Sequence, residues 1–173
     1  VPGFGEGWDV PWSTDEAHTA QLAAAGRCLR HGLFVEEVVR LVDLTDALCS
    51  RLLEDDASQY IVLEDDVIAD WSMLGIIADT DFAASGVDYL RLYYKTVADF
   101  RVRKRRYLTR TSHLIELTSV GYGTQGYVIT RAGAERLVPF FGRVTRPVDD
   151  QLDRFWEHGV PNLALFPFPV IEE

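Results

Sequence analysis

The sequence predicts an α/β fold in which helices flank a mixed β-sheet. Helical and strand-like segments alternate along most of the 173 residues, which is the pattern of a sheet covered by helices. The apolar run at 60–63 is short and rich in β-branched residues, as expected of a strand buried on both faces. The pattern at 100–117 predicts short strands that form an antiparallel extension of the sheet. We expect residues 1–173 to form one domain, because no repeat or linker divides them.

Local signals place the elements along the chain. Ser13 and Glu16 form a capping box, in which the first side chain caps a helix and the second reaches back to it. Thr130 should cap a later helix that Gly142 ends. In the first half of the chain we expect helices from Ser13 towards His31 and over 33–53, a strand at 60–63 and a short helix capped by Asp70 or Ser72. Strands should follow at 87–93, within 100–117 and at 127–129. We then expect one helix after Thr130, another after Pro147 with Trp156 facing inward, and an extended tail at 161–170.

Composition narrows the range of functions. The formal net charge of −10 argues against nucleic acid as the main partner. No apolar run approaches the ~20 residues that a membrane-spanning helix needs, and no signal peptide is recognisable. Cys28 and Cys49 show no metal-ligand spacing, so a reduced compartment is the default expectation, and a disulfide between them stays open.

Three carboxylates directly follow the strand at 60–63. Because side chains alternate along a strand, Glu64 and Asp66 should share one face while Asp65 points to the other. Two acidic groups on one face repel each other unless a cation lies between them, and Mg²⁺ and Mn²⁺ prefer oxygen ligands. We therefore expect a metal site in an open cleft at the C-terminal end of a central strand. The same tripeptide at 54–56 follows a helical pattern and is better explained as a solvated helix end.

A second acidic cluster comprises Asp149, Asp150 and Asp153. Carboxylates in the first turn of a helix are stabilised by its positive end, so a capping role is one explanation. The other explanation is catalytic: if Asp149 faces the same cleft as Glu64 and Asp66, it can act as a general base. The sequence leaves both open.

Basic residues are also clustered. Six of the seventeen lie within ten positions: Arg101, Arg103, Lys104, Arg105, Arg106 and Arg110. Such a group can bind phosphate, and it can equally be the outward charge of an exposed β-ribbon. The glycine-rich run at 121–126 lacks the Lys-Ser/Thr of a P-loop and precedes a strand, so that phosphate-binding motif is excluded.

Four segments occur in an order typical of one enzyme family. They are YIVLEDDV at 60–67, VDYLRL at 87–92, GTQGYVITRAGAERL at 123–137 and PVD at 147–149. In this order they resemble glycosyltransferase family 25, which includes lipopolysaccharide galactosyltransferases and procollagen galactosyltransferases. The resemblance covers about residues 60 to 170, and the pairing of LEDDV with GTQGYVITRAGA is its most specific part.

The resemblance implies a GT-A-like, Rossmann-like fold and an inverting sugar transfer. The expected donor is a nucleotide sugar such as UDP-galactose, and the acceptor a hydroxyl of a cell-surface glycan such as lipopolysaccharide or lipooligosaccharide. Glu64, Asp65 and Asp66 match the family's metal-linked motif, with Mn²⁺ or Mg²⁺ as the cofactor. Asp149 matches the aspartate after the Pro-Val pair and is the expected base, with Asp150 second. For the donor site we expect Thr124 and Gln125, with Arg103 and Arg105 from the basic cluster.

Two departures from the family keep other interpretations open. Family members usually begin with an Ile-Asn-Leu-Asp-Arg-like strand that helps hold the nucleotide, and we expect this first strand to be missing here. The segment Cys28–His31 is one residue shorter than the family's Cys-x-x-Ser-His pattern. The alternatives are a non-catalytic nucleotide- or glycan-binding remnant and another Mg²⁺-dependent phosphoryl-transfer enzyme. We expect a cytoplasmic location, with peripheral contact to the inner membrane left open.

Overall fold

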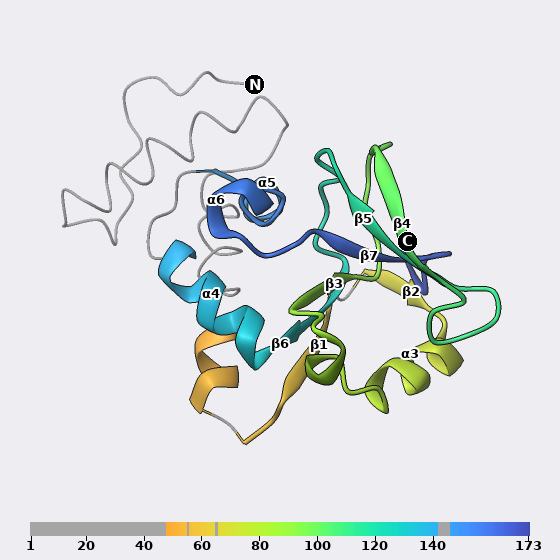
Figure 1. Ribbon diagram of the computed structural model, residues 1–173, viewed down its shortest axis with the longest axis horizontal. Coiled ribbons are helices and arrows are strands. Elements are labelled where there is room, and N and C mark those ends of the chain that lie inside the picture. The colour runs from red at the N-terminus through yellow and green to blue at the C-terminus, as the bar shows by residue number, and fades with distance from the viewer. Residues whose placement is uncertain (1–47, 55, 65, 142–145) are drawn as a thin grey trace.

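The computed structural model describes residues 48–54, 56–64, 66–141 and 146–173 (Figure 1). A six-stranded sheet runs through this part of the chain, and a separate two-stranded ribbon lies beside it. In chain order the elements after the helical segment 48–54 are β1 (Gln59–Leu63), β2 (Val67–Ala69), α3 (Trp71–Ala78), the 3-10 turn η2 (Ala83–Ser85), β3 (Tyr89–Arg91), β4 (Phe100–Arg105), β5 (His113–Leu117), β6 (Gly126–Thr130), α4 (Arg131–Phe141), α5 (Val148–Leu152), α6 (Phe155–His158), β7 (Leu163–Phe166) and β8 (Val170–Glu172). The expectation of a mixed α/β fold is confirmed.

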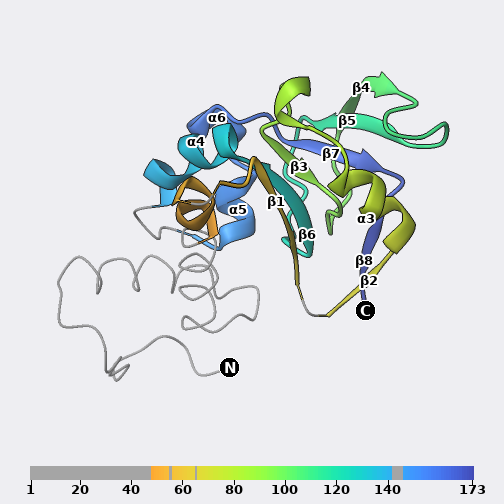
Figure 2. The ribbon, with the colours of Figure 1, turned by 90° about the horizontal axis from the view of Figure 1, so that it is seen from below.

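The strand order in the large sheet is β1-β6-β3-β7-β5-β4. Among the described strands only β3 and β7 run parallel, and every other neighbouring pair is antiparallel. Strands β2 and β8 form the ribbon, with Val67 opposite Glu172. This pairing brings the end of the sequence next to the segment that follows β1 (Figure 2).

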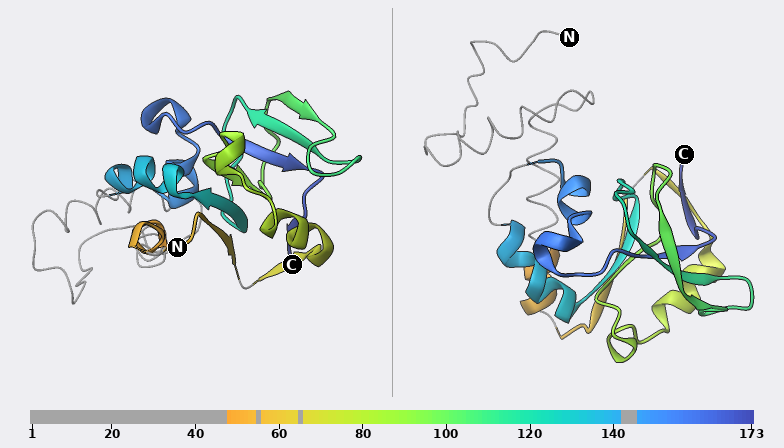
Figure 3. Two further views of the ribbon diagram at one scale, coloured as in Figure 1. Left: turned by 60° about the horizontal axis from the view of Figure 1, so that its bottom comes forward. Right: turned by 45° about the horizontal axis from the view of Figure 1, so that its top comes forward.

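Among the described residues, two large apolar cores lie on opposite faces of the sheet, and a smaller third one contains Ala98, Ile115, Leu117 and Ala164. On one face Tyr89, Tyr127 and Ile129 pack with residues of helix 48–54, α4 and α5. On the other face Leu90 and Val128 pack with residues of α3. Because side chains alternate along each strand, adjacent residues such as Tyr89 and Leu90 contribute to different cores. Figure 3 shows β4 and β5 projecting away from α4.

The first strand departs from its expected position. It was expected to be central, but among the described strands β1 lies at the end of the sheet order. Its residues alternate between the two cores, as a strand with apolar faces should, yet all five are only half-buried. The reason is that no described strand pairs with its outer side.

Several other expectations can be compared with the structure. Asp70 caps α3 by accepting a hydrogen bond from the backbone N–H of Met73 at 3.0 Å, as expected. The single helix expected after Pro147 is instead two short helices, α5 and α6, and Trp156, expected inward, is 56% exposed. The extended tail contains two strands, β7 and β8. The expected helices up to residue 47, with Cys28, lie outside the described residues. Cys49 is buried.

Candidate active site

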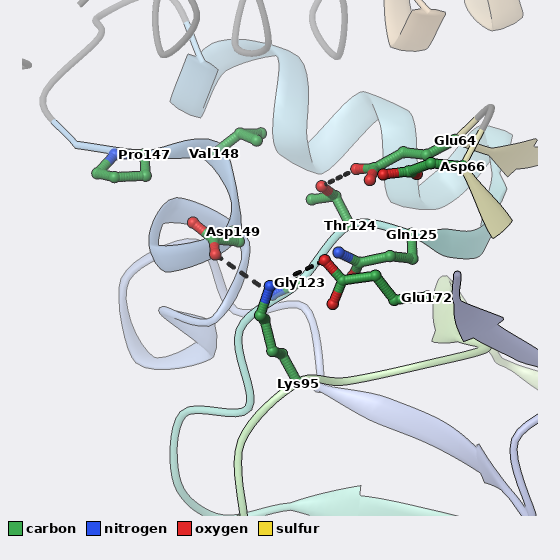
Figure 4. A pocket seen from close by; sticks show the side chains of 10 residues that line it. All are labelled: Glu64, Asp66, Lys95, Gly123, Thr124, Gln125, Pro147, Val148, Asp149 and Glu172. Atoms are coloured by element: carbon green, nitrogen blue, oxygen red, sulfur yellow. Dashed lines mark hydrogen bonds and ion pairs between the residues drawn. The ribbon is translucent and has the colours of Figure 1, made fainter. Parts of the chain in front are cut away.

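A cavity of about 210 Å³ opens where β1, the loop before β6, the start of α5 and the C-terminal strand β8 meet (Figure 4). Its walls bring together residues that are far apart in the sequence. The lining residues are Glu64, Asp66, Lys95, Gly123, Thr124, Gln125, Pro147, Val148, Asp149 and Glu172. Four of them are carboxylates and one is a lysine, so the cavity is strongly acidic.

Glu64 is the most constrained of these carboxylates. Its backbone N–H donates to the carbonyl of Gln125 at 3.0 Å, and its side chain accepts a hydrogen bond from the hydroxyl of Thr124. Burial raises the pKa of Glu64, and the hydrogen bond from Thr124 opposes this rise. Three neighbouring carboxylates raise the pKa further: Asp66, Glu172 and Asp149. The negative charges are therefore close enough to disfavour one another.

Glu172 is a site residue that the sequence did not predict. The β2–β8 pairing places it opposite Val67, and the backbone N–H of Glu173 donates to the carbonyl of Asp66 at 3.0 Å. Its carboxylate accepts a hydrogen bond from Lys95 Nζ at 2.9 Å. No local motif could have identified either residue, because Glu172 reaches the cavity through the ribbon and Lys95 through hydrogen bonds from its backbone N–H to the carbonyls of Gly121 and Tyr122.

A buried ion pair holds the loop that carries Thr124 and Gln125. The Arg91 guanidinium donates to Asp153 Oδ1 at 2.8 Å and to the carbonyl of Tyr122 at 3.2 Å, and both charged side chains are 0% exposed. Asp153 Oδ2 accepts the backbone N–H groups of Gly121 at 3.1 Å and Tyr122 at 2.7 Å. Asn162 contacts both charged groups and completes the network. Since buried charges need partners and hydrogen bonds, this network fixes the loop.

The same loop is tied to Asp149. The backbone N–H of Gly123 donates to Asp149 Oδ2 at 3.3 Å, and the N–H of Asp150 donates to Asp149 Oδ1 at 2.9 Å. Gly123 has φ +88°, and a Cβ there would lie 2.5 Å from Gln125 Oε1, so glycine is required for both conformation and space. Asp149 thus lines the cavity and also organises its own helix and the facing loop (Figure 4).

The second acidic cluster divides into three environments. Asp149 lines the cavity, whereas Asp153 is buried against Arg91. Asp150 is not among the lining residues and instead lies 3.4 Å from Arg154 and 3.9 Å from Arg146. Its surroundings are those of a partly exposed ion-pair network, so it is a poor candidate for a base at this cavity.

Arg103 and Arg105 do not lie where the donor site was expected. Both belong to β4, at the other end of the sheet order from β1, and neither lines the cavity. Arg103 instead pairs with Glu116, 2.5 Å away, which also pairs with Arg101 at 2.7 Å. The two arginines do not line the cavity with Glu64 and Asp66, and they lie on an exposed charged strand, which was the alternative explanation of the basic cluster. The sequence could not show which end of the sheet the hairpin would occupy.

The residues expected to bind the donor and the metal differ in how the structure places them. Thr124 and Gln125 line the cavity, and Gln125 Oε1 has no hydrogen-bond partner among the described residues. Asp65 lies outside the described residues. Within the described ranges no group of three or more acidic, histidine or cysteine side chains is arranged to hold a metal ion. The described residues therefore do not by themselves form a complete metal cage, and Glu64 and Asp66 remain as a pair of candidate ligands.

The comparisons with known proteins point to one family. A family model described as "Glycosyltransferase family 25 (LPS biosynthesis protein)" matches residues 47–152, which is more than half of the 173 residues. No individual curated protein matches the chain. Among the described helices none is long and apolar enough to cross a membrane. Every lining residue of the cavity except Glu172 falls within the matched region.

Proposed function

The chain belongs to glycosyltransferase family 25, a family of LPS biosynthesis proteins, and we propose that it transfers a sugar, galactose above all, from a nucleotide-sugar donor such as UDP-galactose to a hydroxyl of a glycan acceptor such as lipopolysaccharide. One observation carries this proposal. Glu64 and Asp66 lie far from Asp149 within the matched region, yet all three line a single cavity. Fold alone would not assign a reaction, but carboxylates gathered in one cavity provide the groups that this reaction needs.

A divalent cation is part of the proposal. Mg²⁺ is commonly held by one or two carboxylates and completed by water and substrate phosphates, and it rarely has a cage made only of protein ligands. Glu64 and Asp66 suit such a pair, because the charge of Asp66 contributes to the raised pKa of Glu64 and a cation would relieve that repulsion. When bound, Mg²⁺ or Mn²⁺ would supply positive charge that stabilises a diphosphate leaving group.

Asp149 is the proposed general base of an inverting displacement. The acceptor oxygen forms a bond to the anomeric carbon while the bond from that carbon to the donor phosphate breaks. The electron pair of the broken bond leaves with the nucleoside diphosphate, and the hydroxyl proton passes to a carboxylate oxygen of Asp149. The backbone N–H groups of Gly123 and Asp150 hold this carboxylate at the cavity wall, which supports a fixed position for the base.

Lys95 takes the role that the sequence gave to the arginines. Among the described residues that line the cavity, it is the one with a cationic side chain. Its Nζ is held 2.9 Å from Glu172 Oε1, and the Lys95 side chain is 55% exposed. We therefore expect it to reach the donor phosphates, while Thr124 and Gln125 contact the donor from the loop before β6.

The test measures donor binding and turnover separately. The chain is titrated with UDP-galactose and other nucleotide sugars by calorimetry, with and without Mn²⁺ or Mg²⁺. It is then incubated with donor and lipooligosaccharide, and released nucleoside diphosphate and the anomeric configuration of the product are measured. We expect metal-dependent donor binding, acceptor-dependent release and inverted product. Donor binding without turnover would support a binding module instead, and no donor binding under any condition would contradict the proposal.

A further inference from the structure

The strand β4 carries a surface that the proposed reaction does not use. All six residues of this edge strand are exposed. Three large apolar side chains lie here in contact with solvent: Phe100 (53% exposed), Val102 (45%) and Phe166 of β7 (45%). Four basic residues accompany them: Lys104, Arg105, Arg106 and Arg110. We call these seven residues the β4 surface.

The strand register gathers the apolar side chains on one face of the sheet. Val102 lies opposite Ile115, and Phe100 lies opposite Leu117, two positions along the same strand. Phe166 lies opposite His113, which in turn lies opposite Arg105. Directly paired residues and residues two apart point to the same face. The three apolar side chains and Arg105 therefore lie on the same face of the sheet, together with the buried Ile115 and Ala164. The four basic residues of the β4 surface are its basic margin.

The basic margin is not neutralised by the protein. Arg101 and Arg103 are paired with Glu116, but the four basic residues of the β4 surface make no ion pair with an acidic side chain of the described ranges. Lys104 Nζ lies 5.4 Å from the centre of the Tyr107 ring, a cation–π contact that leaves its charge in place. In a chain with a net charge of −10, this is a strong local reversal of charge.

Charge on an edge strand often serves only to prevent strand-to-strand association. Here the basic side chains and the register shift between Val102 and Lys104 already oppose pairing with a second copy, since a bulge disrupts the hydrogen-bonding ladder and two basic edges repel. That function does not explain why two phenylalanines and a valine are exposed beside the charges. A partner that has negative charge at its surface and an apolar interior beneath it would bind both the basic and the exposed apolar side chains.

We propose that the β4 surface docks on an anionic lipid membrane. Lysine and arginine side chains would contact the lipid phosphates, and Phe100, Val102 and Phe166 would enter the boundary between headgroups and acyl chains. The rest of the chain is net acidic and is repelled by the same membrane, which favours an approach by this basic edge. The cavity lies at the other end of the sheet order, and docking would leave it open to substrates. This proposal does not depend on the identity of the transferred sugar.

The test is sedimentation of the chain with sucrose-loaded vesicles of phosphatidylcholine, alone or mixed with phosphatidylglycerol. We expect binding to the mixed vesicles only, weakening as salt rises because the charges are screened. Replacing Arg105, Arg106 and Arg110 together by glutamine should lower partitioning on the order of a hundredfold, because each basic residue at an anionic surface contributes about a factor of five. Phe100→Ser with Val102→Thr should lower partitioning about tenfold at any salt concentration.

A matched control keeps the result specific. Trp71 and Ile76 on α3 are also exposed, at 75% and 41%, and Trp71→Ser with Ile76→Thr should leave partitioning unchanged. Thermal unfolding of each variant establishes that it is folded. The proposal is overturned if phosphatidylglycerol does not increase partitioning of the wild-type chain onto the vesicles, or if the control variant loses as much binding as the β4 variants. Sedimentation velocity without lipid tests the alternative occupant, a second copy of the chain. If the wild-type chain is a dimer and the β4 variants are monomers, this surface is a dimer interface instead.

Discussion

Asp149 and Asp150 are neighbours in the chain, yet their side chains have different surroundings. If Asp149 is the base, Asp149→Asn should lower turnover by ~10²-fold or more while donor affinity stays near the wild-type value, because the amide cannot take the acceptor proton but can still accept a backbone N–H. The measurements are initial rates of nucleoside diphosphate release and calorimetric donor titration.

Asp150→Asn provides the control for this experiment. Its carboxylate lies 3.4 Å from Arg154, outside the cavity-lining residues, so the exchange should change turnover little and stability by ~1 kcal/mol or less. Equal rates for Asp149→Asn and wild type would rule out the catalytic role and leave Asp149 as a residue that organises the helix and the loop.

Glu64 should show a conflict between stability and function. Its pKa in the folded protein is raised above the ordinary value of 4.5, mainly by burial. Ionisation is less favourable in the folded state than in the unfolded state, so at a pH above the raised pKa the charge of Glu64 destabilises the fold. Glu64→Gln should therefore raise the melting temperature at pH 7 by roughly 1–3 °C while weakening metal-dependent donor binding.

The difference in stability between Glu64→Gln and wild type should depend on pH. As pH falls from 7 through the raised pKa, folded wild type takes up the proton first, so the stability gap between variant and wild type should close. Glu116→Gln is the control with the opposite sign, because the hydrogen bond from Arg101 lowers the pKa of Glu116. Removing that ionised group should lower stability or leave it unchanged at pH 7. A lower melting temperature for Glu64→Gln would mean that its charge is needed by the fold.

At the scale of the elements, the loop before β6 depends on the Arg91–Asp153 pair. Asp153→Ala leaves Arg91 buried without its counter-charge and leaves two backbone N–H groups without an acceptor. We expect a loss of about 3–5 kcal/mol in the free energy of unfolding, measured by denaturant titration. Asp88→Ala is the comparison, because its partner Arg136 is 51% exposed, and it should cost less than ~1 kcal/mol. Similar losses for both variants would contradict a special role for the buried pair.

The sequence predicted elements better than their arrangement. Local patterns identified β1, strands within 100–117, β6, α4 and Asp70 as one of two possible caps, because capping, apolar runs and alternation act within a few residues. They also placed Glu64 and Asp66 at the end of a strand. Position in the sheet depends on pairing between distant segments, and so the edge position of β1 and the separation of Arg103 from the cavity were not predictable.

The same reasoning explains which site residues were missed. Lys95 and Glu172 join the cavity only through tertiary contacts, and nothing in their neighbours in sequence indicates this. Arg91 carried a signal that was overlooked: it lies between Leu90 and Leu92 in the run 89–93, whose other residues are apolar or aromatic. A charge in such a strand needs a buried partner, which the second acidic cluster supplied in Asp153.

At the scale of the whole molecule, β8 at the C-terminal end of the sequence forms part of the cavity wall. β8 pairs with β2, which follows Asp66, and it supplies Glu172 to the cavity wall. Val170 is 0% exposed within the core shared with α3, so β8 contributes to the fold and to the site together. Any change that detaches this strand should therefore affect both.

Deleting residues 170–173 tests this dependence. The loss of buried Val170 alone should cost about 1.5–3 kcal/mol, and the loss of the β2–β8 pairing should free the segment that carries Asp66. We expect a lower melting temperature and a donor affinity reduced at least tenfold, measured by thermal unfolding and calorimetric titration of UDP-galactose with Mn²⁺. Ile171→Ser, at a position 47% exposed, and Glu172→Gln separate the contributions: the first should leave both properties unchanged, and the second should change donor affinity with little effect on stability. Full donor affinity in the deletion variant would show that β8 only covers the core and has no part in the site.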